Sequence, residues 1–201
     1  MQQTPVHEKH NAELLRLIPP ASTQLIEVGC SSGALAREFK KANPGCRYLG
    51  VDIDPSYALL ARRYCDETLA ASIEEVGDSF FNAQQDRDCW IFGDTLEHLK
   101  DPWRVLKSIR RVIPDEGCVV ACIPNAQHWS LQVKLSIGQF RYEDSGLLDR
   151  THLRWFTRTT INELFAGAGF QIVQGAPRVF NDAPGDAGPR RAAFRARGPG
   201  E

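Results

Sequence analysis

The sequence lacks three features that would each indicate a particular class of protein. No apolar run is long enough to span a bilayer, and residues 1–10 are polar, without the apolar core of a secretion signal. None of the six cysteines forms a C-x-x-C pair, which argues against a structural zinc site. The formal net charge of −1 provides no overall field for nucleic acid or anionic lipid. We therefore expect a cytoplasmic protein with no membrane span, no nucleic-acid partner and free, buried thiols.

What is present is the composition of one folded domain followed by a different tail. Of the 201 residues, 42% are hydrophobic and 24% are charged, and both fractions are typical of a globular domain. From about residue 181 onward, glycine, proline, alanine and arginine dominate, with almost no large apolar side chains. We predict a folded domain over residues 1–180 and a disordered Gly/Pro/Arg-rich tail over residues 181–201.

Apolar strands alternate with amphipathic helices along the domain. Strands are expected at residues 24–28, 47–51, 68–72, 89–92, 118–123 and 170–173. Helices are expected at residues 11–18, 34–42, 55–64, 74–81, 101–112 and 157–168. This order predicts an α/β fold whose mostly parallel sheet is covered by helices on both faces.

Two features suit a nucleotide-like ligand. After the first expected strand comes a turn of small residues, Gly29-Cys30-Ser31-Ser32-Gly33, which lets a ligand approach the backbone amides. The second expected strand ends in Asp52, whose carboxylate can accept both hydrogen bonds from a ribose diol. The dinucleotide fingerprint G-x-G-x-x-G requires glycines where this chain has Gly29, Ser31 and Ala34. This mismatch disfavours an NAD(P)-dependent oxidoreductase, which remains one alternative.

Glu27 followed by Gly29, Ser31 and Gly33 instead resembles motif I of the class I S-adenosylmethionine-dependent methyltransferases, an acidic residue before G-x-G-x-G. Ser31 replaces the usual central glycine. The segment Asp94-Thr95-Leu96-Glu97-His98-Leu99 is similar to the D-x-L-E-H-L segment of many members. The resemblance covers roughly residues 7 to 175. It implies a Rossmann-like three-layer sandwich and S-adenosyl-L-methionine as the cofactor.

The same resemblance implies which residues contact the cofactor. The glycine turn would hold its methionine part, Asp52 its ribose, and Ile53 would border its adenine. The full set is Glu27, Gly29, Cys30, Ser31, Gly33, Asp52, Ile53, Ser72, Ile73, Asp94 and Thr95. Ser72 stands where many members have aspartate, so its contact is the least well supported.

The fold also implies a final antiparallel hairpin, for which the sequence offers little. Only Arg178-Val179-Phe180 follow the sixth expected strand before the tail begins. We therefore expect this hairpin to be short or missing. A truncated or non-catalytic methyltransferase-like module in a biosynthetic assembly is accordingly a second alternative.

His98 and His152 are the candidates for a base that removes the proton of a hydroxyl acceptor. Asp94, Glu97 and His98 also form D-x-x-E-H, which is similar to the metal-binding E-x-x-E-H of the ubiquinone-pathway O-methyltransferases and the small-RNA 2′-O-methyltransferases. Either His152 or His128 would supply the distant histidine of those families. Because aspartate is shorter than glutamate, and because many members carry these residues without a metal, the pattern does not favour a metal.

Residues 125–157 form a connection long enough to be a lid over an acceptor. Its candidate acceptor contacts are Trp129, Tyr142, Arg150 and Trp155, although at least half of its aromatic and charged residues are expected to pack the lid down or to face solvent. The segment resembles a subgroup that accompanies glycosyltransferases and polysaccharide genes. An N-P-P-Y-like motif is absent, which favours oxygen over nitrogen. The predicted reaction is O-methylation of a small-molecule or glycan-linked acceptor; the oligomeric state is not indicated.

Overall fold

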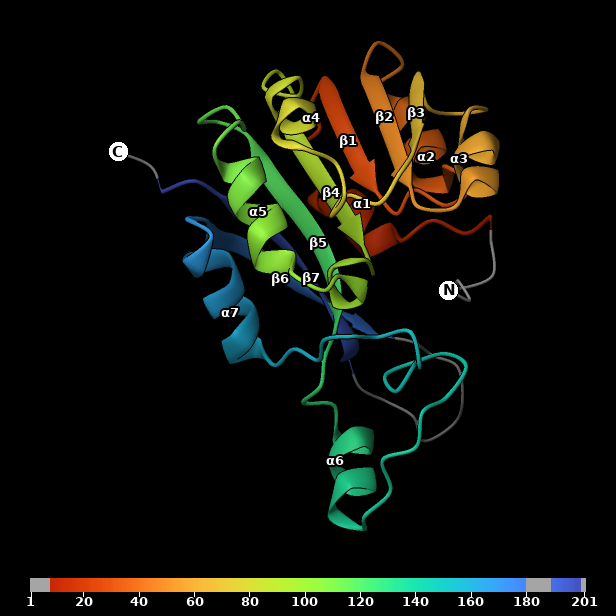
Figure 1. The fold of residues 1–201 in the computed structure, drawn as a ribbon, viewed down its shortest axis with the longest axis vertical. Helices are drawn as coiled ribbons and strands as arrows, with labels where there is room; N and C mark the ends of the chain where they lie inside the picture. The colour runs from red at the N-terminus through yellow and green to blue at the C-terminus, as the bar shows by residue number, and fades with distance from the viewer. Residues whose placement is uncertain (1–7, 180–188, 200–201) are drawn as a thin grey trace.

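A computed structural model of the chain describes residues 8–179 and 189–199. One seven-stranded sheet runs through the molecule in the order β3-β2-β1-β4-β5-β7-β6 (Figure 1). The strands are β1 Gln24–Val28, β2 Arg47–Asp52, β3 Glu67–Ala70, β4 Cys89–Gly93, β5 Cys118–Pro124, β6 Gln171–Val179 and β7 Pro189–Arg197. Strands β1 to β5 pair in parallel, whereas β7 is antiparallel to both of its neighbours. The predicted α/β, Rossmann-like architecture is confirmed.

Helices cover both faces of the sheet and so complete three layers (Figure 1). They are α1 Ala12–Leu17, α2 Ala34–Ala42, α3 Pro55–Ala61, α4 Asp78–Asn82, α5 Pro102–Arg110, α6 Trp129–Ser136 and α7 Arg158–Gly167, with a 3-10 turn η1 at Leu96–His98. Neighbouring residues of one strand enter different cores, as Leu25 packs with α1 and α2 while Ile26 packs with α5 and α7. Strands β1, β4 and β5 are buried along nearly their whole length, which is the pattern of the central strands of a parallel sheet covered on both faces. None of the described helices has the length and apolar character needed to cross a membrane.

Short polar side chains start most of these helices. Asn11, Asp54 and Asp101 each accept a hydrogen bond from a backbone amide in the first turn of α1, α3 and α5. Thr157 forms a capping box with Thr160 at α7. All six cysteines are free and buried, as the sequence predicts.

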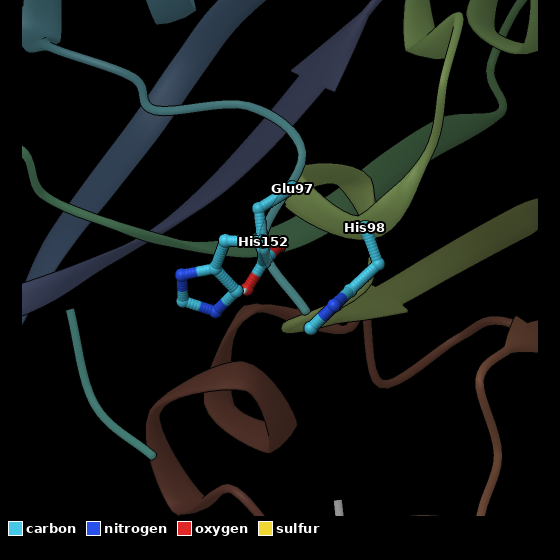
Figure 2. Close-up of side chains that lie close together, drawn as sticks. All are labelled: Glu97, His98 and His152. Atoms are coloured by element: carbon cyan, nitrogen blue, oxygen red, sulfur yellow. Dashed lines mark ion pairs between the residues drawn. The ribbon is translucent and has the colours of Figure 1, made fainter. Parts of the chain in front are cut away.

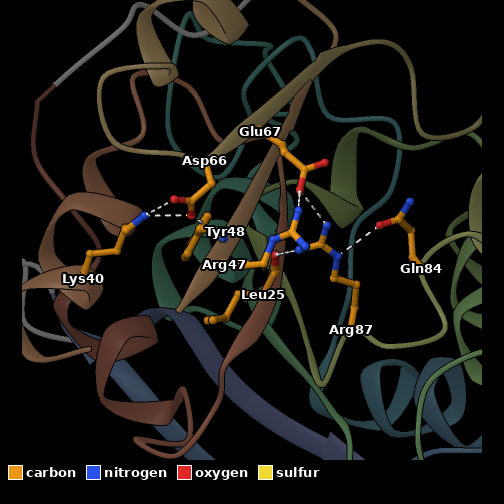
Figure 3. A network of polar contacts seen from close by, with 8 residues as sticks. All are labelled: Leu25, Lys40, Arg47, Tyr48, Asp66, Glu67, Gln84 and Arg87. Atoms are coloured by element: carbon orange, nitrogen blue, oxygen red, sulfur yellow. Dashed lines mark hydrogen bonds and ion pairs between the residues drawn. The ribbon is translucent and has the colours of Figure 1, made fainter. Parts of the chain in front are cut away.

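At the amino edge of the sheet, a polar network ties the first three strands together (Figure 3). The buried guanidinium of Arg87 donates to the carbonyl of Leu25 at 3.4 Å and pairs with Glu67 at 3.4 Å. Asp66 accepts from the amide of Tyr48 at 2.7 Å and from Lys40 at 2.7 Å. These contacts join β1, β2 and β3 at the edge opposite the carboxyl ends of the strands, which leaves those ends available for a site.

The terminal hairpin requires two corrections. The hairpin is not short or missing, because β6 and β7 have nine residues each and β7 inserts between β5 and β6. Residues 189–197, expected in a disordered tail, form β7; residues 180–188 and 200–201 lie outside the described residues. The error has a physical reason. A strand paired on both sides gains backbone hydrogen bonds, and small residues such as Ala193 and Ala196 suffice to fill the closely packed sheet, where both are fully buried.

The long connection after β5 contains a helix that the sequence did not predict. Helix α6 projects from the body of the molecule, and residues 137–157 return from it to the sheet (Figure 1). Trp129, Val133 and Ile137 are exposed, and only Leu131 of the helix is buried. Because its apolar residues do not form one buried face, the segment lacks the periodicity by which a helix is usually predicted.

Candidate active site

The turn after β1 lies at the carboxyl edge of the sheet, where ligands bind in open α/β sheets. Its backbone is left-handed at Gly29 (φ 78°), Ser31 (φ 49°) and Gly33 (φ 77°). The amide of Gly29 donates to the carbonyl of Val51 at 2.8 Å, so the turn is attached to the end of β2. A non-glycine residue in this region costs about 1–2 kcal/mol, and the amide of Ser31 offsets part of that cost by donating to Asp52 Oδ2 at 2.8 Å.

The two glycines of the turn also meet packed neighbours. A Cβ added at Gly29 would lie 2.5 Å from Thr95 Oγ1, and one added at Gly33 would lie 3.2 Å from the Cα of Ala61. The hydroxyl of Thr95 donates to the carbonyl of Val28 at 3.0 Å, which holds the loop after β4 against the turn. The sequence therefore needs glycine at 29 and 33 both for conformation and for space.

Asp52 is buried at the end of β2 and faces the same turn. Its two carboxylate oxygens accept from the amides of Ser31 at 2.8 Å and Asp54 at 2.9 Å. Burial raises the pKa of this carboxyl above its ordinary value. Each oxygen has a second lone pair, so the carboxylate can still accept from a ligand hydroxyl. Ile53 beside it is 53% exposed, as a contact for a flat ring would require.

Other predicted cofactor residues occupy less direct positions. Ile73 is buried in the core, and the Ser72 hydroxyl accepts from the amide of Glu74 at 3.3 Å. The thiol of Cys30 packs into the core beside Gly50, so it is the Cys30 backbone that faces the turn. Glu27 is buried beneath the turn and accepts from Tyr48 Oη at 2.9 Å, and burial raises its pKa to about 8.

Asp94 follows β4 and pairs with a residue that the sequence did not single out. Its Oδ2 lies 2.6 Å from Nη1 of Arg191, which β7 brings to the site. Asp94 also has left-handed backbone, with φ 56°. Arg191 was missed because it fell in the expected tail. Ala192, Phe194 and Ala196 at alternate positions are the period-two signal that would have revealed the strand.

Glu97, His98 and His152 come together in a second cluster (Figure 2). Glu97 and His98 belong to η1, whereas His152 belongs to the long connection after β5. The imidazole centroids are 4.9 Å apart, and Glu97 Oε1 lies 4.0 Å from His152 Nε2. The Glu97 carbonyl accepts from the amides of Leu153 and Arg154 at 2.9 and 3.0 Å, which secures the connection to η1. The two predicted base candidates therefore share one site.

Burial favours the uncharged form of each group in this cluster. It raises the pKa of the Glu97 carboxyl well above its ordinary value. It lowers the pKa of His98, and it lowers that of His152 to about 4 with a further contribution from the neighbouring imidazole. Both rings are therefore neutral at physiological pH, with one nitrogen of each able to act as an acceptor or ligand.

The structure divides the D-x-x-E-H pattern. Glu97 and His98 meet His152, whereas the Asp94 carboxylate contacts Arg191. His128, the other histidine considered for the pattern, caps α6 and has its Nδ1 2.8 Å from the hydroxyl of Ser130.

The predicted acceptor contacts are not all in one place. Phe140, Tyr142 and Trp155 form a cluster of rings whose centroids lie 5.7 to 6.1 Å apart. Trp155 Nε1 donates to the carbonyl of Leu147 at 3.1 Å, and Tyr142 is 54% exposed. Trp129 packs instead against His128 at the start of α6, and Arg150 pairs with Asp144 at 2.6 Å. Their contact with an acceptor stays a prediction.

Comparisons with known proteins find both a sequence relative and solved structures of the same fold. An uncharacterised methyltransferase of Mycobacterium leprae is 30% identical over 102 residues, which make up 51% of this chain and 37% of that relative. A solved S-adenosylmethionine-dependent methyltransferase from Mesorhizobium loti superposes with a TM-score of 0.71 at 14% identity, covering 92% of this chain and 95% of that one. The solved structure of a putative S-adenosylmethionine-dependent methyltransferase from Listeria monocytogenes gives a TM-score of 0.69 at 15% identity, covering 94% of this chain and 97% of that one.

A family model described as a methyltransferase domain matches residues 5–175. This range contains the glycine turn, Asp52 and the Glu97–His98–His152 cluster, and it excludes β7. The chain therefore belongs to the methyltransferase domain family.

Proposed function

We propose that the chain is an S-adenosylmethionine-dependent methyltransferase that methylates an oxygen atom of a small-molecule or glycan-linked acceptor. The observation that carries the proposal is the left-handed glycine turn after β1, joined to the buried Asp52 carboxylate at the end of β2. At the same edge of the sheet is the largely buried cluster of Glu97 and His98, which follow β4, and His152, which belongs to the connection after β5. A ligand site and a reaction site thus share one edge of the sheet.

The residues of the turn fit the cofactor. Gly29 and Gly33 allow the left-handed backbone of a tight turn that a ligand can approach, and the second lone pairs of Asp52 suit the ribose hydroxyls. Exposed Ile53 suits the adenine face. When bound, S-adenosylmethionine supplies the electrophilic methyl group of its sulfonium. The protein contributes alignment and exclusion of water, which are the main requirements of an in-line displacement.

Oxygen is the proposed acceptor atom because of the chemistry of the Glu97–His98–His152 cluster. A hydroxyl group must lose its proton as it is methylated, and Glu97, His98 and His152 lie where they can promote that loss. The exposed rings of Phe140 and Tyr142 suit stacking on a sugar or an aromatic ring. Arg150 in the same connection suits a phosphate or carboxylate of the acceptor.

Calorimetric titration with S-adenosylhomocysteine, with NADH in parallel, tests the cofactor. We expect micromolar binding of the first ligand only, and at least about a tenfold loss of affinity, or 1.4 kcal/mol, in Asp52→Ala. Asp115→Ala is the matched control, because this exposed aspartate lies before β5 at the opposite edge of the sheet. Binding of NADH alone would overturn the proposal in favour of an oxidoreductase.

The non-catalytic alternative has lost its main support. It rested on a short or missing terminal hairpin, and the described residues contain a paired one. Binding of S-adenosylhomocysteine without methylation of any sugar, phenol or phosphorylated glycan in an acceptor screen would return support to it.

A further inference from the structure

We propose that Glu97, His98 and His152 form a binding site for a first-row divalent cation, with zinc as the reference ion. The inference deepens the proposed function, because the cation would bind the acceptor oxygen at the same edge of the sheet. The sequence pattern did not favour a metal. The structure changes that interpretation, because it places His152 beside η1 and pairs Asp94 with Arg191.

The three donors are close enough for one ion. One ligand atom from each residue lies within 4.8 Å of the other two, and the three side chains come together at one place (Figure 2). Donors around a tetrahedral zinc ion are separated by about 3.3 Å, given bond lengths near 2.0–2.1 Å. The largest separation would have to shorten by at most about 1.5 Å, which is within the reach of side-chain rotation without movement of the backbone.

The backbone presents the correct nitrogen of each ring. His98 Nδ1 lies 3.1 Å from the carbonyl of Thr151, and His152 Nδ1 lies 3.3 Å from the carbonyl of Leu147. A carbonyl can only accept, so each Nδ1 carries the proton and each Nε2 keeps its lone pair. Histidine ligands of metal ions are held in this way, with the second nitrogen donating to a carbonyl or carboxylate.

Glu97 supplies the second, independent observation. Its side chain is 1% exposed, and neither carboxyl oxygen has a hydrogen-bond partner among the described residues. Buried polar atoms almost always have partners, because leaving one without costs about 1–3 kcal/mol. A cation bound to this carboxylate would supply the missing interaction for both oxygens.

The donor set selects the class of ion. Two neutral imidazoles and one carboxylate match the catalytic zinc sites that keep a fourth position open for water or substrate. The same set also suits iron(II), cobalt(II) and manganese(II), whereas magnesium prefers oxygen ligands throughout. Calcium is disfavoured for the same reason.

The open position gives the ion a role in the proposed reaction. A hydroxyl bound there has a lowered pKa and releases its proton to water, leaving an alkoxide or phenoxide. That oxygen then forms a bond to the methyl carbon as the carbon–sulfur bond breaks, and neutral S-adenosylhomocysteine leaves. His98 and His152 act as ligands in this scheme rather than as bases.

The experiment measures metal binding without reference to activity. The full chain, stripped with chelator, is titrated calorimetrically with zinc and, separately, with cobalt(II), whose visible absorption reports the ligands. Glu97→Gln, His98→Gln and His152→Gln are compared with wild type, and His10→Gln, a histidine outside the cluster, is the matched control. Melting curves establish that each variant is folded.

We expect wild type and His10→Gln to bind one equivalent that each cluster variant loses or binds at least a hundredfold more weakly. Any zinc bound by cysteines would persist in all variants, so the site is measured by the difference in bound zinc between wild type and each cluster variant. Equal binding by wild type and all folded cluster variants would overturn the metal site. S-adenosylhomocysteine binding, measured on the same samples, keeps the two proposals apart, since either can fail while the other stands.

Discussion

The two halves of the candidate site are built in different ways. The cofactor half consists of the two short turns that follow β1 and β2, in which backbone amides donate hydrogen bonds to the Asp52 carboxylate. The acceptor half joins η1, the connection after β5 and β7, which are far apart in sequence. It leaves the carboxyl oxygens of Glu97 without a hydrogen-bond partner among the described residues, and it leaves several aromatic rings exposed. The polar groups of the cofactor half already have partners within the protein, whereas the Glu97 carboxyl of the acceptor half is left for a bound group to satisfy.

Gly29→Ala is expected to have the largest effect on stability, because it disrupts the turn of the cofactor half. A side chain there requires φ 78° and a Cβ 2.5 Å from Thr95 Oγ1. We expect the free energy of unfolding to fall by about 2–4 kcal/mol. We also expect S-adenosylhomocysteine binding to be lost. Thermal melts and calorimetry measure both. Gly45→Ala is the control, since its Cβ would meet nothing within 4 Å; similar losses in the two variants would contradict the argument.

Glu27 provides the second prediction, a pH dependence beneath the cofactor half. The folded state keeps the proton of Glu27 up to about pH 8, while the unfolded chain loses it near the ordinary glutamate pKa of 4.5. The folded state therefore binds more protons in this window, and its stability must fall as pH rises through it. The slope is at most about 1.4 kcal/mol per pH unit.

Denaturant unfolding of wild type and Glu27→Gln between pH 5 and pH 8 checks this prediction. The variant cannot ionise at this position, so the stability of wild type should decline relative to it as pH rises, and level off above pH 8. Stability curves that stay parallel across the window would show that Glu27 ionises normally in the folded protein.

The third prediction concerns the contact that joins β7 to the acceptor half. Arg191→Ala leaves the half-buried Asp94 carboxylate without its guanidinium, and we expect a loss of about 1–3 kcal/mol. Arg197→Ala on the same strand removes only a 3.8 Å pair with the exposed Glu116 and should cost about 0–1 kcal/mol. A double-mutant cycle with Asp94→Asn measures the coupling, and a value near zero would show that the pair does not stabilise the site.

Arg150→Ala should have the smallest effect on stability. Its pair with Asp144 is exposed, so the free energy of unfolding should change by about 0.5 kcal/mol or less. If the connection recognises an anionic acceptor, KM for that acceptor should rise while the affinity for S-adenosylhomocysteine is unchanged. Steady-state kinetics with anionic and neutral acceptors would reveal the difference, and equal KM changes for both would count against charge recognition.

The same contrast explains what could be predicted from sequence. The bounds of β1 and α2 match the prediction residue for residue, because strong apolar runs and a glycine turn set them locally. β7 was missed because its stability comes from pairing with β5 and β6 rather than from large side chains. α6 was missed because its apolar residues do not share one buried face.

The site follows the same rule. The turn and Asp52 were predicted from their order along the chain, and the structure places them together. The meeting of His152 with Glu97, and of Arg191 with Asp94, depends on how distant segments return to the sheet. No local sequence pattern specifies where these segments return. The meeting of His152 with Glu97 was therefore considered only as one possibility, and the contact between Arg191 and Asp94 was not predicted at all.

The insertion of β7 between β5 and β6 has a consequence for the order in which the protein is made. On the ribosome, β1 to β5 emerge first and can form a parallel sheet with the glycine turn in place. β6 pairs only with β7 in this sheet, so it must wait for residues 189–197 to be synthesised. At that stage the chain already carries the glycine turn and Asp52, whereas Arg191 has not yet reached Asp94, so the contact between Arg191 and Asp94 is among the last to form.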